Sequence, residues 1–411
     1  MLFFDSIFQD NTKNSINSDY SCKNWNIETW KKFPILQQAN FDKTNEYYKI
    51  LNEIAQVKNF IEFDSLERIK QKLSAASLGH CFVLQTGDCA EQFSDCTKET
   101  VTKKLAEYKA QKEFLQKVIL KEVLLIGRIA GQFAKPRSEE LEKLNSELLP
   151  VYRGDIVNRP DKNLIARQHN FKNLKTAQKC AQKVHKLIQN YNKCDEIFTS
   201  HEALLLEYEN CYTKYHAGFH KYYNSSTHFF WIGERTRQLN NAHIEYAKNL
   251  FNPIGIKISE NINSEELISL INKINPLNES GKISLITRFG SNKVQKYLPP
   301  LIQAVKKNFF NVTWICDPMH GNTEQTIEKI KTRNLNNIQK EISLNMEIHG
   351  NENSILAGVH LETSEQFVTE CYSENSNITI SDVPKNYKSA CDPRLNPDQT
   401  REILKIFSRL N

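Results

Sequence analysis

The sequence predicts an α/β protein, a (β/α)8 TIM barrel with an N-terminal helical extension. Eight short apolar runs follow one another from residue 81 onward, segments with helical spacing lie between them, and a charged or metal-ligand side chain closes nearly every run. Strands that alternate with helices indicate a parallel sheet, and barrel enzymes place their active sites at the C-terminal ends of the strands. The predicted strands cover residues 81–84, 123–126, 196–199, 229–232, 254–258, 283–286, 312–316 and 355–359.

The runs are continuously apolar, which is typical of parallel strands that are covered on both faces. An open doubly wound sheet would give similar runs, but the charged strand ends favour the barrel. Asn396, Pro397 and Asp398 supply a start signal for a closing helix. The predicted helices of the barrel cover residues 97–119, 165–191, 203–220, 236–250, 264–274, 291–308, 323–346 and 398–409.

The 411 residues divide into two predicted parts. Residues 1–78 form the extension, which is largely helical, with helices at about 43–58 and 62–77. Residues 79–411 form the catalytic barrel, a length that fits the 250 residues or more that such barrels usually occupy.

Composition excludes several classes of protein. The net charge is only +6 and no block of like charges stands out, so nucleic acid binding is not indicated. The ten cysteines include no CxxC pair, which argues against a disulfide scaffold or a zinc ribbon and favours a reducing compartment. The N-terminus does not resemble a signal peptide, and no run of 18 apolar residues occurs. We therefore expect a cytoplasmic protein that does not bind membranes.

Three strand ends carry side chains of metal-ligand type. Cys89, His320 and Glu362 follow the first, seventh and eighth predicted strands, which become neighbours when the barrel closes. Asp392, in the loop after the eighth strand, is the best-placed fourth ligand. One such side chain alone is usually structural, but three on adjacent strand ends indicate a metal site. The mixture of thiolate, imidazole and carboxylate suits Mn²⁺, Fe²⁺, Co²⁺ or Zn²⁺ and is poor for Ca²⁺.

The other strand ends carry cations. Four basic side chains facing one mouth repel one another, so their partner should be an anion such as phosphate or carboxylate. A proline-constrained loop beyond the second strand adds two more cations and a hydroxyl, which indicates a second anion site or, alternatively, a solvated basic turn. The first group is Arg128, Arg235, Lys257 and Arg288, and the second is Lys135, Arg137 and Ser138.

A series of motifs in these same segments resembles the class II 3-deoxy-D-arabino-heptulosonate 7-phosphate synthases. The resemblance runs in order from about residue 80 to 396 and is highly specific as a set. Thr86 stands where a glycine is common and Gln92 where a serine is common, and neither is a predicted ligand. The motifs are QTGDCAE at 85–91, GRIAGQFAKPRS at 127–138, YRGD at 152–155, TSHEAL at 199–204, WIGERTR at 231–237, NPIG at 252–255, CDPMHGNT at 316–323, GVHLE at 358–362 and ACDPRL at 390–395.

The resemblance implies a reaction and a role for each site residue. Phosphoenolpyruvate would condense with erythrose 4-phosphate and water to give the seven-carbon sugar phosphate and phosphate, which is the first step of the shikimate pathway to chorismate and the aromatic amino acids. Glu202 or Glu234 could orient the attacking water, and Lys257 would take part in catalysis. The metal ligands would be Cys89, His320, Glu362 and Asp392. The phosphoenolpyruvate site would comprise Arg128, Glu234, Arg235, Lys257 and Arg288, and the erythrose 4-phosphate site Lys135, Arg137 and Ser138.

The resemblance also implies a cofactor and partners. The expected cofactor is a divalent metal, Mn²⁺ first, with Co²⁺, Zn²⁺, Fe²⁺ and Cd²⁺ as alternatives. The expected assembly is a homo-oligomer, a dimer or a tetramer, with chorismate mutase as a candidate partner. Between Ser138 and Thr199 the sequence has room for one clear helix where longer family members carry more, so we expect weak or no inhibition by Trp or Phe through that region.

Three alternatives stay open at this point. The same reaction could serve a secondary pathway such as phenazine synthesis, or an eight-carbon sugar acid could be made from arabinose 5-phosphate. A catalytically silent barrel that acts as a regulatory partner would be expected to lack some ligand or cation, and all are present. A further hypothesis concerns Cys391, which should lie close to Cys89 and could form a disulfide with it when metal is absent.

Overall fold

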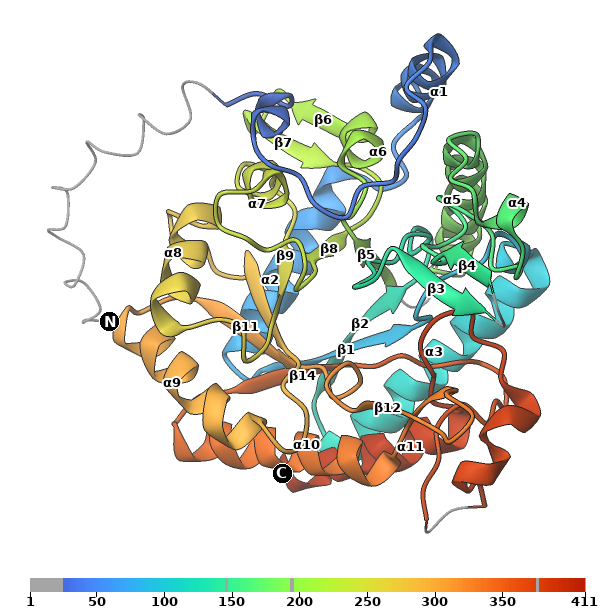
Figure 1. Ribbon diagram of the computed structural model, residues 1–411. Coiled ribbons are helices and arrows are strands. Elements are labelled where there is room, and N and C mark those ends of the chain that lie inside the picture. Colours follow the sequence, from blue (N-terminus) through green and yellow to red (C-terminus); the bar gives the residue numbers. More distant parts are fainter. Residues whose placement is uncertain (1–24, 145–146, 193–195, 375–376, 411) are drawn as a thin grey trace, which may run out of the picture.

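The computed structural model describes residues 25–144, 147–192, 196–374 and 377–410, and it confirms the predicted barrel. Eight parallel strands close on themselves, because the last strand pairs with the first (Figure 1). Nearly every residue of these strands is buried. Around the barrel the strands are β1 (Cys81–Gly87), β2 (Glu122–Arg128), β5 (Phe198–Glu202), β8 (Phe229–Ile232), β9 (Ile254–Ile258), β10 (Ile283–Thr287), β11 (Val312–Cys316) and β14 (Leu356–His360).

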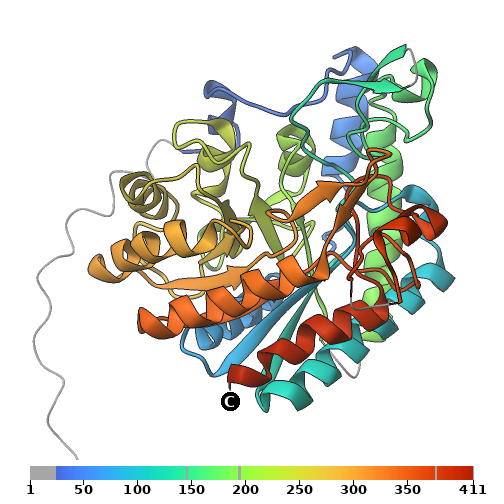
Figure 2. The same cartoon turned by 60° about the horizontal axis from the view of Figure 1, so that its bottom comes forward.

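Helices surround the barrel, and local signals in the sequence set their ends. Asn263 and Asn396 cap the helices that follow them, and Asn396 forms a capping box with Gln399. The last helix packs beside α3 on the outside of the barrel (Figure 2). The outer helices are α3 (Lys98–Ile119), α4 (Leu164–Arg167), α5 (Asn173–Tyr191), α6 (Leu206–Cys211), α7 (Ala242–Ala247), α8 (Ser264–Ile274), α9 (Val294–Lys307), α10 (Leu335–Asn351) and α11 (Pro397–Lys405).

Four of the predicted helices are partly wrong. Residues 165–191 are interrupted between α4 and α5, and of residues 236–250 only Ala242–Ala247 forms a helix, α7. The other two contain hairpins. Residues 203–220 form the short α6 followed by a hairpin of β6 (Thr213–His216) and β7 (Lys221–Asn224), in which Tyr215 pairs with Tyr222 across the strands. Residues 323–346 begin with a hairpin of β12 (Thr323–Gln325) and β13 (Lys331–Arg333), and α10 starts only after its N-cap Asn334. In both places strand pairing at the barrel mouth overrides helical spacing.

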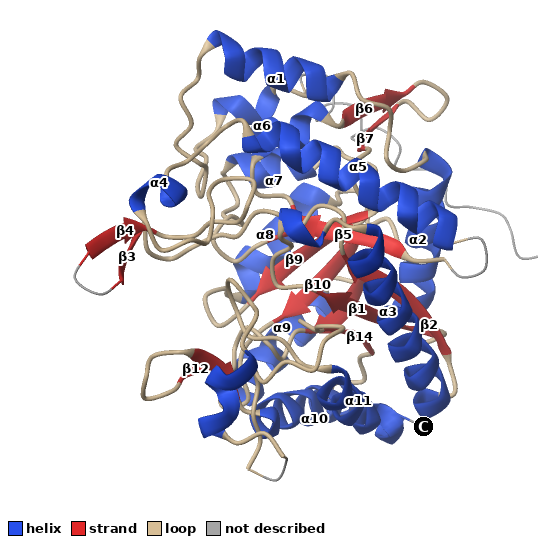
Figure 3. Ribbon diagram, turned by 90° about the vertical axis from the view of Figure 1, so that its right-hand side faces the viewer, coloured by secondary structure: helices blue, strands red, loops and turns tan. Residues whose placement is uncertain are grey.

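A third hairpin extends the loop after β2. It consists of β3 (Leu141–Leu144) and β4 (Glu147–Pro150). Among the described residues of 139–198, α5 is the one long helix, as predicted, and α4 adds a single turn. In Figure 3 the hairpins β3–β4 and β12–β13 lie on one side of the barrel strands and α2 (Phe63–Ser77) lies on the opposite side.

The extension contributes α1 (Asn45–Ala55) and α2 (Phe63–Ser77). Ile69, Leu73 and Ala76 of α2 are fully buried and pack against inward-facing side chains of the strands. Helix α2 therefore closes the N-terminal end of the barrel. The predicted site residues lie at the opposite, C-terminal end. The proposed boundary at residue 78 stays a prediction.

Candidate active site

The predicted site residues gather at the C-terminal mouth of the barrel, around a cleft of about 380 Å³. Strand ends supply the walls, and the loop after β2 supplies one rim. Cys89 and Glu362 are fully buried next to the cleft. The other predicted residues line it: Arg128, Lys135, Arg137, Ser138, Glu202, Glu234, Arg235, Lys257, Arg288, His320 and Asp392.

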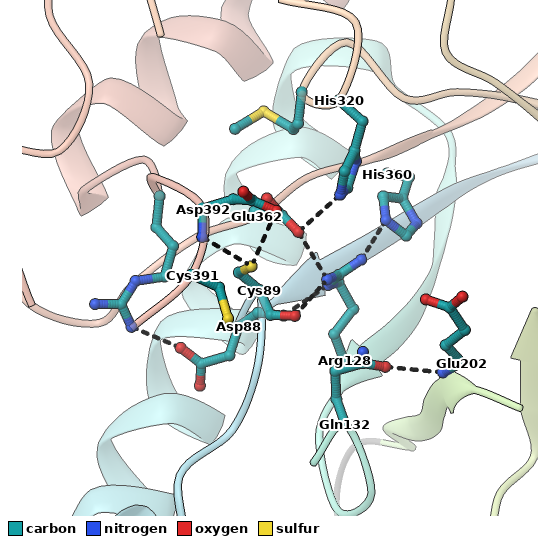
Figure 4. A network of polar contacts seen from close by, with 12 residues as sticks. Asp88, Cys89, Arg128, Gln132, Glu202, His320, His360, Glu362, Cys391 and Asp392 are labelled. Atoms are coloured by element: carbon teal, nitrogen blue, oxygen red, sulfur yellow. Dashed lines mark hydrogen bonds and ion pairs between the residues drawn. The ribbon is translucent and has the colours of Figure 1, made fainter. Parts of the chain in front are cut away.

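The four predicted metal ligands come together. One ligand atom each of Cys89, Glu362 and Asp392 lies within 4.8 Å of the other two. His320 joins through Nε2, which is 3.0 Å from Glu362 Oε1, and Figure 4 shows these side chains pointing toward one another. A thiol, an imidazole and two carboxylates around one point fit a divalent transition metal.

Lys135 occupies an unexpected place in this set. Its ammonium lies 2.9 Å from Cys89 Sγ, 3.0 Å from Asp392 Oδ2 and 3.4 Å from Glu362 Oε1. The resemblance implies a role in binding erythrose 4-phosphate, whereas the geometry puts its positive charge among the metal ligands. An ammonium held by three such groups indicates that this point of the site attracts a cation.

The Glu362 carboxylate is the electrostatic centre of the ligand set. Although burial alone would raise its pKa, the positive charges of His320, Lys135 and Arg333 hold the pKa well below its usual range. Arg128 donates to Oε1 at 3.0 Å and Arg333 to Oε2 at 2.8 Å. Glu362 is therefore an anion at any physiological pH and is available as a ligand.

The pKa of the Cys89 thiol is shifted in the opposite direction to that of Glu362. Burial, a hydrogen bond with Cys391 and the nearby charge of Glu362 raise the pKa of the thiol well above the usual value. The thiol is therefore protonated in this environment, and a divalent metal held beside it would favour the thiolate, since metal binding releases protons from such ligands.

His320 is oriented by Asp317, which is not among the residues predicted for the site. Asp317 Oδ2 accepts from His320 Nδ1 at 2.8 Å, and Oδ1 accepts from the backbone N–H groups of Met319 and His320. This arrangement turns Nε2 toward Glu362, and a carboxylate behind a histidine ligand commonly fixes its tautomer and orientation. The Lys257 ammonium also contacts Asp317 Oδ2, so one buried carboxylate touches both a predicted ligand and a predicted substrate cation.

Arg128 is anchored from several sides. Its Nε donates to the carbonyl of Asp88 at 2.8 Å, and the guanidinium lies 5.0 Å from the centre of the Trp231 ring. It also contacts His360 Nε2 (Figure 4). Burial and the charges of Lys257 and Arg128 hold the pKa of His360 well below its usual range, so the neutral ring accepts from Arg128. Arg128 is thus a rigid cation that borders the ligand set.

The remaining cations face the cleft with fewer partners. Burial lowers the pKa of Lys257 to about 8, with Asp317 opposing the shift and Arg128 and Arg288 adding to it. Arg288 Nη2 donates to the His320 carbonyl at 3.1 Å. Arg235 donates to Ser138 Oγ at 2.6 and 3.2 Å, so a residue expected at the phosphoenolpyruvate site contacts one expected at the sugar phosphate site. The two predicted anion sites are therefore adjacent.

The two candidate glutamates differ in their surroundings. Glu234 Oε1 accepts from Arg237 at 2.8 Å and from Ser259 at 2.8 Å. Each glutamate also has one buried oxygen without a hydrogen-bond partner among the described residues, Oε2 in Glu234 and Oε1 in Glu202. The backbone N–H of Glu202 donates to Gln132 Oε1 at 2.8 Å. Burial raises the pKa of Glu202. A raised pKa of this kind, in a buried carboxyl group beside a cleft, is common among groups that exchange protons.

A second layer of contacts fixes the loops that carry the ligands. Arg394 Nη1 donates to Asp88 at 2.7 Å and Nη2 to Glu370 at 2.9 Å. Asp88 precedes Cys89, and Arg394 follows Asp392 by two residues, so this bridge fixes two ligand segments relative to each other.

Lys331 and Arg333 were missed in the sequence. They belong to the β12–β13 hairpin, where Lys331 donates to Asp392 Oδ1 at 2.8 Å and Arg333 contacts Glu362. The stretch reads as helical from its spacing, which hid both residues. Their sequence signal was only a Lys-Thr-Arg run that follows His320 by about ten residues.

Fold and site together define a (β/α)8 barrel protein of the kind that can hold a divalent cation beside an anionic substrate. The sequence pattern of the class-II DAHP synthetase family matches residues 25–195 and 189–407. The chain belongs to that family.

Curated relatives agree with this assignment. The chain is 33% identical to phospho-2-dehydro-3-deoxyheptonate aldolase of Neurospora crassa, over 92% of each chain. It is 31% identical to the protein of the same name from Streptomyces coelicolor, over 93% of this chain and 96% of the relative. A probable phospho-2-dehydro-3-deoxyheptonate aldolase of Pseudomonas fluorescens is 34% identical, over 90% of this chain and 93% of the relative.

Among solved structures, phospho-2-dehydro-3-deoxyheptonate aldolase from Francisella tularensis superposes with a TM-score of 0.53 at 15% identity, covering 90% of this chain and 98% of that one. At this identity the likeness supports the barrel fold alone. In the described part of the chain, every helix is too short or too polar to cross a lipid bilayer.

Proposed function

We propose that this protein catalyses the condensation of phosphoenolpyruvate with erythrose 4-phosphate and water to give 3-deoxy-D-arabino-heptulosonate 7-phosphate and phosphate. The observation that carries the proposal is that four metal-ligand side chains meet beside a cleft that a ring of cations lines, in a member of this family. The reaction needs both parts, because it joins an aldehyde to a phosphorylated carboxylate.

The divalent metal, Mn²⁺ first, would be held by Cys89, His320, Glu362 and Asp392. When bound, it supplies Lewis-acid polarisation of the aldehyde carbonyl. The donor set fits such an ion because two of its members are anionic oxygens and Lys135 already places a positive charge among them. Co²⁺, Zn²⁺, Fe²⁺ and Cd²⁺ are alternatives for the same ligands.

The cations would bind and orient the two anionic substrates. Arg128, Lys257 and Arg288 surround the inner part of the cleft, where they would hold the carboxylate and phosphate of phosphoenolpyruvate. Arg137 and Ser138 lie at the rim, where they would bind the phosphate of the sugar. Arg235 connects the two groups. This order would place the enol carbon, C3, next to the aldehyde carbon that it attacks.

Later steps need proton transfer and neutralisation of charge. Carbon–carbon bond formation leaves positive character at C2, water adds there, and the hemiketal then expels phosphate. The raised pKa of Glu202 suits a group that accepts a proton from that water. The arginines and Lys257 would stabilise the negative charge that develops on the leaving phosphate.

The test is an assay of phosphoenolpyruvate loss with erythrose 4-phosphate. We expect turnover that a chelator abolishes and that added Mn²⁺ or Co²⁺ restores. Turnover that ignores the chelator would reject the metal, and turnover only with arabinose 5-phosphate would reject the sugar substrate.

Several further expectations accompany this proposal. The enzyme would open the shikimate pathway in the cytoplasm as a homo-oligomer, with chorismate mutase as a candidate partner. Light scattering of the purified protein, with and without that partner, measures the assembly.

A further inference from the structure

The chain that joins the extension to the barrel passes the rim of the cleft. Residues 33–44 have no regular secondary structure and connect a 3-10 turn (Thr29–Lys32) to α1. We name residues 34–40 the strap, and Figure 1 shows this dark blue segment crossing beside β5 toward α1. The strap is tied down along its length: Pro34 accepts from Ala242 N at 2.9 Å, Gln38 Nε2 donates to the Leu204 carbonyl at 2.7 Å, and Asn40 N donates to His169 at 2.9 Å.

Gln37, at the middle of the strap, holds the rim loop that carries Arg137. Its Oε1 accepts from the backbone N–H of Arg137 at 2.9 Å and from Arg153 Nη2 at 3.2 Å. Arg153 Nη2 also donates to the Gln37 carbonyl at 3.1 Å, and the Arg153 carbonyl accepts from Lys135 N at 2.9 Å. Gln37 and Arg153 thus clamp the backbone on both sides of Pro136.

The backbone of Gln37 supports a specific role for this side chain. Its φ is +61°, in the left-handed region that residues other than glycine and asparagine seldom adopt. A glutamine in such a conformation needs a compensating contact, and strained residues of this kind concentrate at functional sites. The contacts with Arg137 and Arg153 are the ones that use its side chain.

The neutrality of the amide matters because the rim is positively charged. Burial lowers the pKa of Arg153, and the nearby charge of Arg137 adds to this effect while Glu140 opposes it. An uncharged acceptor satisfies the Arg137 N–H without forming an ion pair. Among the residues that the structure describes, none accepts from the Arg137 guanidinium, so its charge stays available to a phosphate in the cleft.

We propose that Gln37 is a positioning residue, which fixes the backbone of Arg137 so that the rim loop keeps the shape that receives the phosphate of the sugar substrate. The inference rests on the proposed function and assigns a binding role to a residue outside the barrel. It predicts that Gln37 affects the affinity for erythrose 4-phosphate and leaves phosphoenolpyruvate binding alone.

Gln37→Gly and Gln37→Ala test the inference against a matched control, Gln38→Ala. Both variants remove the side-chain acceptor. Glycine adopts the positive φ without strain, whereas alanine keeps the strain. The control removes an equal side chain of the same strap, one that contacts Leu204 and Leu206. Circular dichroism and a thermal melt establish that each variant is folded.

The expected result is a KM for erythrose 4-phosphate raised about tenfold in both Gln37 variants, the size expected when the Arg137 N–H loses its hydrogen bond. The KM for phosphoenolpyruvate should stay within about twofold of wild type, and Gln38→Ala should match wild type for both substrates. An unchanged KM for the sugar in folded Gln37→Gly, an equal rise for both substrates, or an equal rise in Gln38→Ala would overturn the inference.

Calorimetric titration with erythrose 4-phosphate provides a second measurement that does not depend on turnover. A wild type that binds the sugar phosphate about tenfold more tightly than Gln37→Gly, yet does not turn over phosphoenolpyruvate, would reject the proposed reaction and support the role of Gln37. A wild type that binds no erythrose 4-phosphate would overturn both.

Discussion

The two ends of the barrel are built from the same eight strands but have opposite chemistry. At the base, Leu73 and Ala76 of α2 meet the apolar interior of the barrel. At the mouth, the cations Lys257 and Arg128 lie close enough to repel each other. Lys257 is paired with Asp317, and Arg128 is paired with Glu362. Like charges held close together cost free energy. The comparison indicates that apolar packing at the base stabilises the fold. At the mouth, the fold holds charged side chains close together, where they can bind a ligand.

We expect the largest effect on activity from the removal of a predicted metal ligand at the mouth. His320→Ala should lower kcat by roughly 100-fold or more, because even changes behind a ligand cost 10- to 100-fold in metal affinity or activity. The melting temperature of the metal-free protein should also fall, because the buried carboxylates of Asp317 and Glu362 each lose the His320 ring as a partner. Steady-state kinetics and metal content per chain measure the first effect, and a thermal melt measures the second. Full activity with normal metal content would remove His320 from the ligand set.

The converse change is at the base. Leu73→Ala should destabilise the protein by about 2–5 kcal/mol, the usual cost of emptying a fully buried leucine site. Its kcat and KM values should stay near wild type below the melting temperature. Gln71→Ala, on the exposed face of the same helix, serves as the control for denaturant unfolding. A selective loss of activity in Leu73→Ala without loss of stability would break the division between the two ends.

A smaller effect concerns the charge of Lys257. Its pKa is lowered to about 8, so the ammonium is present below pH 8 and is lost as the pH rises through that value. Because only the charged form can bind an anion, the KM for phosphoenolpyruvate should rise by up to about tenfold per pH unit above 8. The KM for erythrose 4-phosphate should change less. A flat pH profile for phosphoenolpyruvate between pH 7 and 9.5 would show that Lys257 does not bind it.

The smallest effect concerns the thiols of Cys89 and Cys391, which lie in one buried cluster, as the sequence predicts. Aged metal-free protein should lose this pair of thiols to a disulfide, whereas bound metal should protect them. Thiol counting under denaturing conditions measures the loss, and Cys391→Ser is the control that should keep Cys89 reduced. Equal thiol loss in that variant would contradict the pairing.

Most of the fold could be predicted because the strands and helices leave local signals. The helix predicted at residues 264–274 is α8, and all eight predicted strands fall on barrel strands. The hairpins β6–β7 and β12–β13 could not be predicted, because cross-strand pairing at the mouth stabilises them against a local helical pattern. The ligand set followed from strand ends, since parallel strands in a barrel end at one mouth.

By itself the sequence determined the barrel, its family, and the residue types that meet at the mouth, because periodicity and strand-end chemistry are local properties. Only the tertiary structure decided which of these side chains contact one another at the mouth. It put Lys135 among the metal ligands, brought Arg333 to Glu362 from a hairpin, and set Gln37 against Arg137 across 100 residues of chain. Such contacts depend on packing between distant segments, and no spacing in the sequence records them.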